Sequence, residues 1–241
     1  MDDLTYNYIK RQIGDILGID LNQYKAPQMQ RRLTSYLGRL GYSNWPMYFR
    51  VVRSDEAVAQ ALRDYLTINV SSFMRDQNKF LTLERDILPQ LGRPGVPLRI
   101  WSAGCSRGQE PYTVAMMLAE RDGIANHHRI LATDIDDTTL NWARAGGPYS
   151  EDDVKSLPRA WLNKYVDKRD GKYWVQDLIR RKPMFRQNDM LKLLPQGKFD
   201  LIICRNVVIY FKPEVKDILY RRFYEALRPG GGLFVGGTEI V

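Results

Sequence analysis

The sequence is poor in cysteine and histidine and has no long apolar run. Its 241 residues include two cysteines and two histidines, which excludes a disulfide-stapled fold and a zinc site of four cysteines. Cys105 and Cys204 lie in or just after strand-like runs, as expected of reduced thiols. No stretch approaches the roughly 18 apolar residues of a membrane span, and the acidic N-terminus lacks the features of a signal peptide. We therefore expect a cytoplasmic protein without membrane insertion.

Acidic residues are absent from one stretch near the N-terminus. Between Leu21 and Ser54 there is no Asp or Glu, although the formal net charge of the whole chain is only +8. The basic residues of this stretch are Lys25, Arg31, Arg32, Arg39, Arg50 and Arg53. One-sided charge of this kind attracts nucleic acid, an anionic membrane surface or a carboxylate-rich protein. Composition alone leaves these three partners open.

The N-terminal part of the chain reads as a set of helices. Apolar residues recur at helical spacing between Leu4 and Leu17, where Gly18 can end the helix, and again between Met29 and Leu40. Asn44 and Asp55 can cap two further helices. The second apolar stripe leaves a basic helix face formed by Arg31, Arg32 and Arg39.

From Leu98 onward, strand-like runs alternate with helical segments. The runs expected to form strands are 98–103, 129–135, 184–187, 199–204 and 232–236. Continuous apolar strands separated by helices predict a mostly parallel sheet that is covered on both faces. A polar turn at 168–171, between two short β-rich runs, predicts a small hairpin inserted into this domain.

The first expected strand leads into a glycine-rich turn. Gly104 and Gly108 allow the backbone to turn tightly and to approach a ligand closely. Their spacing differs from the G-x-G-x-x-G of dinucleotide sites. Glu110, at the start of the next helix, would repel a pyrophosphate and favour a cationic group. S-adenosylmethionine (SAM) offers an ammonium and a sulfonium, whereas a plain strand–turn–helix with a capping glutamate is the alternative.

Polar side chains also follow two later strands. Asp134 ends the second strand, where a carboxylate holds a ribose diol in open α/β sheets. Its alternative role is to cap the next helix, which Asp136 can also do. Asn206 and Tyr210 either bind a ligand at the carboxyl edge of the sheet or serve as a helix cap and a packed aromatic. The polar stretch 69–76 reads locally as a turn and a cap.

Taken together, these motifs resemble the CheR family of chemotaxis-receptor glutamate O-methyltransferases. The resemblance covers nearly the whole chain, in order, through segments 67–76, 98–113, 132–136, 199–211, 227–231 and 236–239. It implies a class I SAM-dependent methyltransferase with a Rossmann-like, mostly parallel sheet, a small all-helical N-terminal domain and an inserted antiparallel β-subdomain. We expect a helical domain at 1–72 and a SAM-binding domain at 73–241, with the insertion at about 160–184.

The same resemblance implies a set of site residues. Those expected to contact SAM or its product S-adenosylhomocysteine are Asn69, Ser71, Arg75, Gly104, Glu110, Asp134, Asn188, Asp189, Asn206 and Val207. Arg75 and Tyr210 would lie nearest the transferred methyl group, and no metal is expected. Arg31, Arg32 and Arg39 would dock a receptor helix. The chain departs from the usual pattern at Gln109 and Asp189, where the family has Glu and Leu.

The implied reaction is methylation of receptor glutamates in sensory adaptation. A glutamate side chain is ionised at pH 7, so no general base is required, and we expect His127 and His128 to lie solvated in a loop. The implied partners are the cytoplasmic helices of membrane chemoreceptors. We expect this protein to be a monomer and to bind no nucleic acid. Family members continue beyond Glu239 with residues that complete the sheet, so we expect an open edge strand here.

Two other functions compete with receptor methylation. A SAM-dependent RNA methyltransferase would also use basic patches, which suit phosphate backbones. A non-catalytic SAM-binding receptor scaffold would need neither Arg75 nor Tyr210, although the sequence has both.

Overall fold

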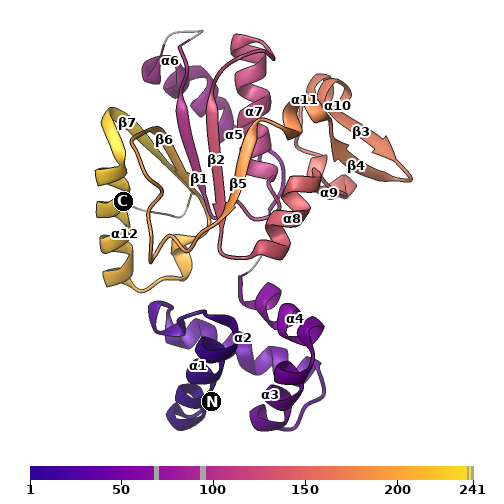
Figure 1. The fold of residues 1–241 in the computed structure, drawn as a ribbon, viewed down its shortest axis with the longest axis vertical. Helices are drawn as coiled ribbons and strands as arrows, with labels where there is room; N and C mark the ends of the chain where they lie inside the picture. Colours follow the sequence, from indigo (N-terminus) through magenta and orange to yellow (C-terminus); the bar gives the residue numbers. More distant parts are fainter. Residues whose placement is uncertain (68–70, 93–95, 238, 240–241) are drawn as a thin grey trace. The chain divides into compact units, whose positions relative to one another are not determined.

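Two compact units share the chain. The computed structural model describes residues 1–67, 71–92, 96–237 and 239. One unit joins Met1–Ile68 to a short late segment, Val207–Ile218, and the other comprises Asn69–Asn206 and Leu219–Val241. Figure 1 labels their elements. The chain therefore passes from one unit to the other after Asn206 and returns inside a helix.

The first unit begins with helices α1 (Asp3–Leu17), α2 (Ala26–Arg39), α3 (Trp45–Ser54) and α4 (Glu56–Thr67). Their boundaries follow local sequence signals. Gly18 ends α1 in a left-handed conformation, with φ 69°. The Asn44 side chain accepts a hydrogen bond from Met47 N at 3.0 Å, and Asp55 accepts one from Ala57 N at 2.8 Å. The predicted stop and both predicted caps are confirmed.

The buried face of α1 differs from the face expected at its start. The residues that α1 buries are Tyr6, Ile9, Ile13 and Leu17. Leu4, which the sequence pattern placed on the apolar stripe, is 84% exposed. The stripe is therefore shifted in the first turn, where Tyr6 is buried and Leu4 is not.

The late segment of the first unit pairs with the connection between α1 and α2. This segment contains the 3-10 turn η3 (Val208–Tyr210) and the start of α12 (Pro213–Ala226). Tyr24 forms an antiparallel bridge with Phe211, and their rings meet edge to face at 5.2 Å. Lys25 N donates to the Tyr210 carbonyl at 3.0 Å. The backbone of Tyr210 is thus held by residues that precede α2.

The second unit is built on a parallel sheet of order β5-β2-β1-β6-β7. Its strands are β1 (Arg99–Ala103), β2 (Arg129–Asp134), β5 (Pro183–Gln187), β6 (Phe199–Cys204) and β7 (Leu227–Val235). All four neighbouring pairs run parallel, which confirms the predicted sheet. The strand order reverses between β1 and β6, and ligands bind at such a switch point, beyond the carboxyl ends of the strands.

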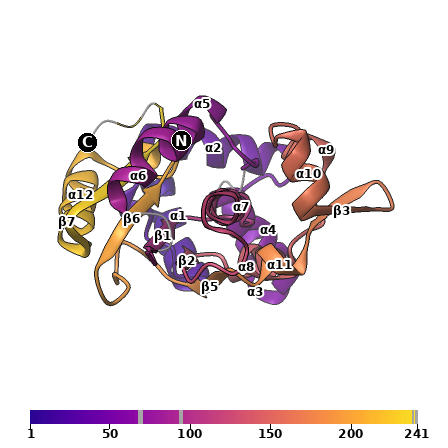
Figure 2. The same ribbon diagram turned by 90° about the horizontal axis from the view of Figure 1, so that it is seen from above.

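Helices pack on both faces of this sheet. The face that carries Phe185 of β5 meets Tyr112 of α7 (Gln109–Asp122) at a ring distance of 5.5 Å. The opposite face carries Trp101 of β1, which meets Phe223 of α12 at 5.4 Å. Figure 2 shows α7 and α12 on opposite sides of the strands. The remaining helical elements before the inserted region are α5 (Gln77–Thr82), the π-helical turn η2 (Leu83–Ile87), α6 (Leu88–Leu91) and α8 (Asp137–Ala145).

The predicted inserted hairpin is present. Strands β3 (Val166–Arg169) and β4 (Lys172–Val175) pair antiparallel in a separate two-stranded sheet. Asp170 and Gly171 form the turn with φ of 49° and 74°, as a two-residue hairpin turn requires. Short helices flank the hairpin: α9 (Glu151–Val154), α10 (Arg159–Tyr165) and α11 (Asp177–Arg180).

The expectation of two solvated histidines is wrong for His128. His127 is exposed, but His128 is buried. Its Nδ1 accepts the Leu98 backbone N–H at 3.0 Å, and its Nε2 lies 2.6 Å from Asp122 Oδ2. His128 therefore fixes the entry to β1 against the end of α7. Among the described residues, none of the helices is both long enough and apolar enough to traverse a lipid bilayer.

Candidate functional site

The glycine-rich turn after β1 folds onto the end of β2. Backbone N–H groups of Gly104 and Cys105 both donate to the Thr133 carbonyl, at 2.8 and 2.9 Å. Gly108 has φ 87°, and a Cβ at this position would lie only 2.9 Å from Ala143 Cβ of α8. The turn therefore requires glycine both for its backbone conformation and for the close packing of α8.

Asp134 presents a buried carboxylate beside this turn. Its Oδ2 accepts from Ser106 N at 2.8 Å, and its Oδ1 accepts from Asp136 N at 3.1 Å. Burial raises the pKa of the Asp134 carboxyl to about 6. Asp136 caps α8 through Thr138 N at 3.0 Å, so Asp134 is not the cap. Each Asp134 oxygen can accept a further hydrogen bond, as two hydroxyls of a diol would supply.

Glu110 lies in the first turn of α7 and is also withdrawn from water. Its side chain is 12% exposed. Ser102 Oγ donates to Oε1 at 2.8 Å, and Arg205 Nη1 lies 3.8 Å from Oε2. Burial raises the pKa of Glu110 to about 7, although the positive charge of Arg205 opposes that rise. A cationic ligand would stabilise the ionised form of this carboxyl.

Arg205 is the candidate site residue that sequence reasoning missed. It follows β6 directly and is buried, with its guanidinium 4.9 and 5.1 Å from the ring centroids of Phe80 and Phe234. Its Nη2 donates to the Arg75 carbonyl at 2.8 Å and to Asp76 Oδ2 at 2.7 Å. Arg205 thereby joins the Arg75 segment to Glu110. An arginine directly after the apolar run Leu201–Cys204 is the sequence signal, because a buried cation needs carboxylate partners.

The segment that carries Arg75 has an unusual backbone. Met74 and Asp76, on either side of Arg75, have φ of 47° and 59°, a region that non-glycine residues rarely adopt. Met74 N donates to Thr113 Oγ1 of α7 at 3.2 Å. Such strained residues cluster at functional sites. The backbone here fixes the position of Arg75 against α7 and Arg205.

Ser71 is tied to α7 by the unusual Gln109. Gln109 is fully buried, and its Nε2 donates to the Ser71 carbonyl and to Asp153 Oδ1, each at 3.3 Å. An amide can make both contacts, whereas a glutamate at this position would set its charge against Asp153. The nearby Asp153 carboxylate therefore explains why glutamine suits this position better than the usual glutamate.

Asn206 and Asn188 follow β6 and β5, two strands that β1 and β2 separate in the sheet. Asn206 has φ 58°, and its N–H donates to Glu239 Oε2 at 2.9 Å. Gly236 N donates to the same oxygen at 2.6 Å, so Glu239 ties the end of β6 to the end of β7. Asn188 N donates to the Asp134 carbonyl at 2.9 Å, and its side chain holds the Leu193 carbonyl. The next residue after Asn188 begins a turn.

That turn starts at Asp189. Its Oδ1 accepts from Leu191 N at 2.9 Å, and its carbonyl accepts from Leu193 N at 2.9 Å. The carboxylate thus organises the loop after β5, a role that the leucine usual at this position could not fill. Lys192 Nζ lies 3.4 Å from Asp189 Oδ2 on the surface of the same loop.

Three of the expected site residues lie outside the described part of the second unit. Val207 and Tyr210 belong to the first unit, where Tyr210 N donates to the Val207 carbonyl at 3.4 Å. Asn69 lies outside the described residues. The second unit itself brings together Glu110, Asp134 and the Arg75 backbone around the turn after β1.

The basic face of α2 is partly used within the first unit. Arg31 and Arg39 are exposed, and the Arg39 guanidinium lies 5.2 Å from the Tyr65 ring centroid. Arg32 is half-buried, donates to the Tyr65 carbonyl, and lies 4.7 Å from the same ring. Arg32 therefore contributes to α2–α4 packing, whereas Arg31 and Arg39 present their charges to solvent.

The acidic side chains of the second unit are suited to bind SAM. Two desolvated carboxylates, Glu110 and Asp134, lie beside the turn after β1, and they match an ammonium and a ribose diol. They would repel a phosphate. In the part of the chain that the structure describes, no group of His, Cys, Asp and Glu is arranged to hold a metal ion.

Comparison with known proteins agrees with this chemistry. Residues 4–67 match the model of the CheR methyltransferase all-alpha domain, and residues 69–241 match that of the CheR methyltransferase SAM binding domain. The chemotaxis protein methyltransferase of Listeria monocytogenes is 39% identical over 237 residues, which cover 98% of this chain and 90% of that protein. The corresponding Borreliella burgdorferi protein is 35% identical over 262 residues, covering 99% and 91%. The structure of the glycopeptide N-methyltransferase MtfA with SAM aligns at 14% identity and a TM-score of 0.40, covering 64% of this chain and 52% of that one.

Proposed function

The chain belongs to the CheR methyltransferase family, SAM-dependent methyltransferases of the chemotaxis type, and we propose that it methylates glutamate side chains of chemotaxis receptors. The products are glutamate methyl esters and S-adenosylhomocysteine. The single observation that carries this proposal is the near full-length match to chemotaxis protein methyltransferases. The family, the class I fold and the cofactor are those that the sequence predicts.

The chemistry of the acceptor explains why the site needs no base. When bound, SAM supplies an electrophilic methyl group on a sulfonium. An oxygen of the substrate carboxylate forms the new C–O bond as the C–S bond breaks, and no proton is transferred. Opposite charges disappear in this step, so exclusion of water favours it. Alignment of the two reactants can supply on the order of 7–11 kcal/mol.

We assign the roles of this chain's residues accordingly. Glu110 binds the ammonium group of SAM, and Asp134 accepts hydrogen bonds from its ribose. Arg75 orients the substrate carboxylate, while Tyr210 donates a hydrogen bond that fixes the reacting oxygen or the end of the cofactor. Arg205 is a positioning residue, because it holds the Arg75 carbonyl and faces Glu110. The further cofactor contacts that we propose are Asn69, Ser71, Gly104, Asn188, Asp189, Asn206 and Val207.

We propose that the basic face of α2 docks the receptor's cytoplasmic helices. Arg31 and Arg39 are exposed and would steer an acidic helix, with Arg32 at the edge of the face. Such steering is screened within about 8 Å at physiological salt. The rate of receptor methylation should therefore fall as ionic strength rises, and a flat response between low and physiological salt would count against docking by this face.

A labelling experiment tests the proposed reaction. Purified protein is incubated with methyl-labelled SAM and either receptor-containing membranes or RNA. Label in base-labile protein esters supports glutamate methylation, label in RNA supports the RNA methyltransferase alternative, and no transfer despite SAM binding supports a scaffold. Arg75→Ala and Tyr210→Phe should both lose turnover while folding normally. Full turnover with normal SAM affinity in both variants would remove their assigned roles.

A further inference from the structure

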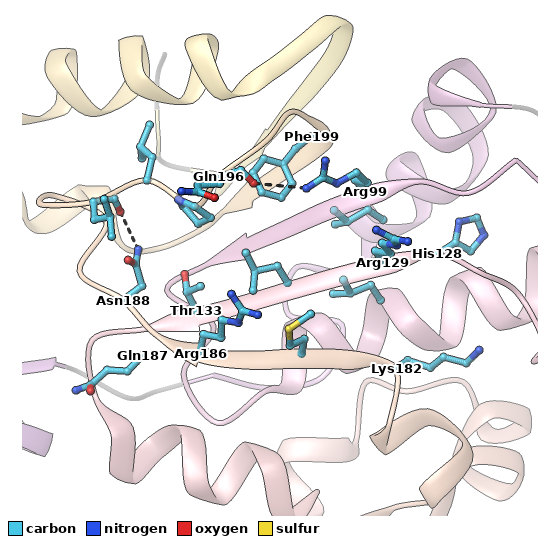
Figure 3. Close-up of a pocket in the computed structure, with 17 residues that line it drawn as sticks. Arg99, His128, Arg129, Thr133, Lys182, Arg186, Gln187, Asn188, Gln196 and Phe199 are labelled. Atoms are coloured by element: carbon cyan, nitrogen blue, oxygen red, sulfur yellow. Dashed lines mark hydrogen bonds between the residues drawn. The ribbon is translucent and has the colours of Figure 1, made fainter.

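A loop lies over part of one face of the parallel sheet (Figure 3). On the face that carries Trp101, α12 packs over β1 through Phe223. The part of this face formed by β2 and β5 looks instead onto the loop 188–198 that connects β5 to β6. Between that loop and the strands lies a cavity of ≈ 680 Å³ (Figure 3). The cavity belongs to the second unit alone.

The floor of this groove is apolar and exposed. Leu131 of β2 and Met184 of β5 are partners in the strand register and point to the same face. Met184 is 51% exposed, and Leu193 of the overlying loop is 67% exposed. Contiguous exposed apolar side chains rimmed by polar groups are typical of a surface that binds another molecule.

The rim of the groove is basic. Arg99 of β1 and Arg129 of β2 are partners in the strand register at one end of the groove. Lys182 directly precedes β5, and Arg186 of β5 is the register partner of Thr133. Figure 3 shows these four side chains around the groove. Within the described residues, none of the four forms an ion pair. No described carboxylate neutralises their positive charge, although Lys182 Nζ donates to the Asn126 carbonyl at 3.1 Å and Arg99 lies 5.5 Å from the Phe199 ring centroid.

Acidic groups near this rim are already engaged. Asp200 accepts the Arg99 backbone N–H at 2.5 Å, but its carboxylate is paired with the Arg228 guanidinium. Asp122 faces His128 at 2.6 Å and Arg121 at 3.3 Å. These carboxylates do not neutralise the cations of the groove.

The polar lining argues for a protein segment over a small ligand. Small-molecule sites place a few buried polar groups toward the ligand. The two buried polar side chains here are satisfied by the protein: Thr133 Oγ1 accepts from Trp101 Nε1 at 2.9 Å, and His128 Nδ1 accepts from Leu98 N at 3.0 Å. What remains is an apolar floor with long cationic side chains around it, which suits an amphipathic segment with acidic flanks.

We propose that this groove binds an acidic amphipathic segment of the methyl-accepting protein, at a place other than the glutamate that is methylated. The inference rests on the proposed function, because a substrate that presents acceptor glutamates carries the carboxylates that the rim would bind. Apolar residues of the segment contact Met184 and Leu193, and its carboxylates pair with Arg99, Arg129 and Arg186. The groove would thus hold the substrate without taking part in methyl transfer.

Steady-state methylation of receptor membranes tests this inference. The variant Arg129→Glu/Arg186→Glu should raise KM for receptor about tenfold at low salt, with kcat and the SAM dissociation constant unchanged. Met184→Gln should raise the same KM about threefold. The matched control is Arg85→Glu/Arg221→Glu, which reverses two exposed charges elsewhere in the second unit and changes net charge equally. The control should stay within about twofold of wild type.

The outcomes separate this inference from the proposed function. If wild type methylates receptors but the groove variant keeps the wild-type KM, or if the control shifts KM as much, the groove is not a docking site. Competition by inorganic phosphate beyond its effect on ionic strength would also overturn the inference, since it would indicate a small-anion site. If wild type transfers no methyl to receptors, the proposed function fails and this inference fails with it.

Discussion

SAM binding should depend steeply on pH near neutrality, because the two carboxylates proposed to receive it are buried. Glu110 has a pKa of about 7 and Asp134 a pKa of about 6, both raised by burial. An ammonium and a ribose diol each bind the ionised carboxylate best. Binding must therefore remove the protons that these groups hold in the free protein.

The size of the effect follows from the two pKa values. Lowering the pH from about 7.5 to about 6 protonates most of Glu110 in the free protein, which weakens binding about eightfold. The same change protonates half of Asp134 and adds a factor of about two. SAM affinity should thus fall about 16-fold over this range. At about pH 6.5, binding should release about one proton.

Titration calorimetry measures both quantities. Dissociation constants for SAM are recorded across this pH range, and the proton release is obtained by repeating the titration in buffers with different ionisation enthalpies. Glu110→Gln is the control, because it keeps the shape of the side chain and removes the titrating group. Its remaining pH dependence should be the factor of about two that Asp134 contributes.

Two results would refute this reasoning. Wild-type affinity that is constant between about pH 6 and pH 7.5, without proton release, would mean that Glu110 is already ionised in the free protein. An unchanged pH dependence in Glu110→Gln would assign the titration to another group.

Three further predictions concern the groups around this site. Arg205→Met should move the pH midpoint of SAM binding above that of wild type and lower kcat/KM about 100-fold, and Arg205→Lys should recover part of this loss. An unchanged midpoint in calorimetry would show that Arg205 does not lower the pKa of Glu110. Glu110→Gln should raise the free energy of unfolding of the SAM-free protein by about 1–3 kcal/mol at pH 8 and by less than about 1 kcal/mol at pH 5. The raised pKa means that the folded protein loses stability as pH rises from 4.5 to about 7, and urea unfolding at both pH values measures the difference. Gly108→Ala should lower the free energy of unfolding by about 2–4 kcal/mol, because it adds a steric overlap with α8 to the strain of its positive φ. Gly171→Ala, at φ 74° with no atom within 4 Å, should lower it by about 1 kcal/mol. Equal urea midpoints for the two variants would count against the overlap.

Local sequence signals predict the elements of this fold well. Gly18, Asn44 and Asp55 act on groups within a few residues of themselves, so the helix boundaries can be read without knowing the tertiary structure. The Asp170-Gly171 turn likewise defines its hairpin from two residues. The central strands are also recognisable, because burial on both faces gives β1 and β6 predominantly apolar runs.

Strand length at the sheet edge is predicted less well. The pattern of apolar residues predicts a strand at 232–236, but β7 begins at Leu227 and includes Pro229. Its pairing with β6 shifts register between Phe199 and Leu201. A bulge of this kind accommodates glycine and proline at an edge, and no residue pattern within the strand itself announces it.

Contacts between distant residues account for what the sequence does not predict. Arg205 meets Asp76 across 129 positions, and Asn206 meets Glu239 across 33. His128 is buried because Leu98, 30 residues earlier, supplies its donor. Periodicity and motifs carry no information about such pairs. The resemblance to a family locates the strand ends that bear the site, but the groups that set the charge of Glu110 become visible only in the folded chain.

The residues proposed to act in methyl transfer are divided between the two units. Glu110, Asp134 and Arg75, which would bind the methyl donor and orient the acceptor, belong to the second unit, whereas Tyr210 belongs to the first. The backbone of Tyr210 is held by Lys25, immediately before the helix that bears the basic face. The residue proposed to align the reacting oxygen and the face proposed to dock the receptor therefore share one compact unit. The Tyr210→Phe variant and the salt dependence of receptor methylation therefore test two proposed roles of the same compact unit.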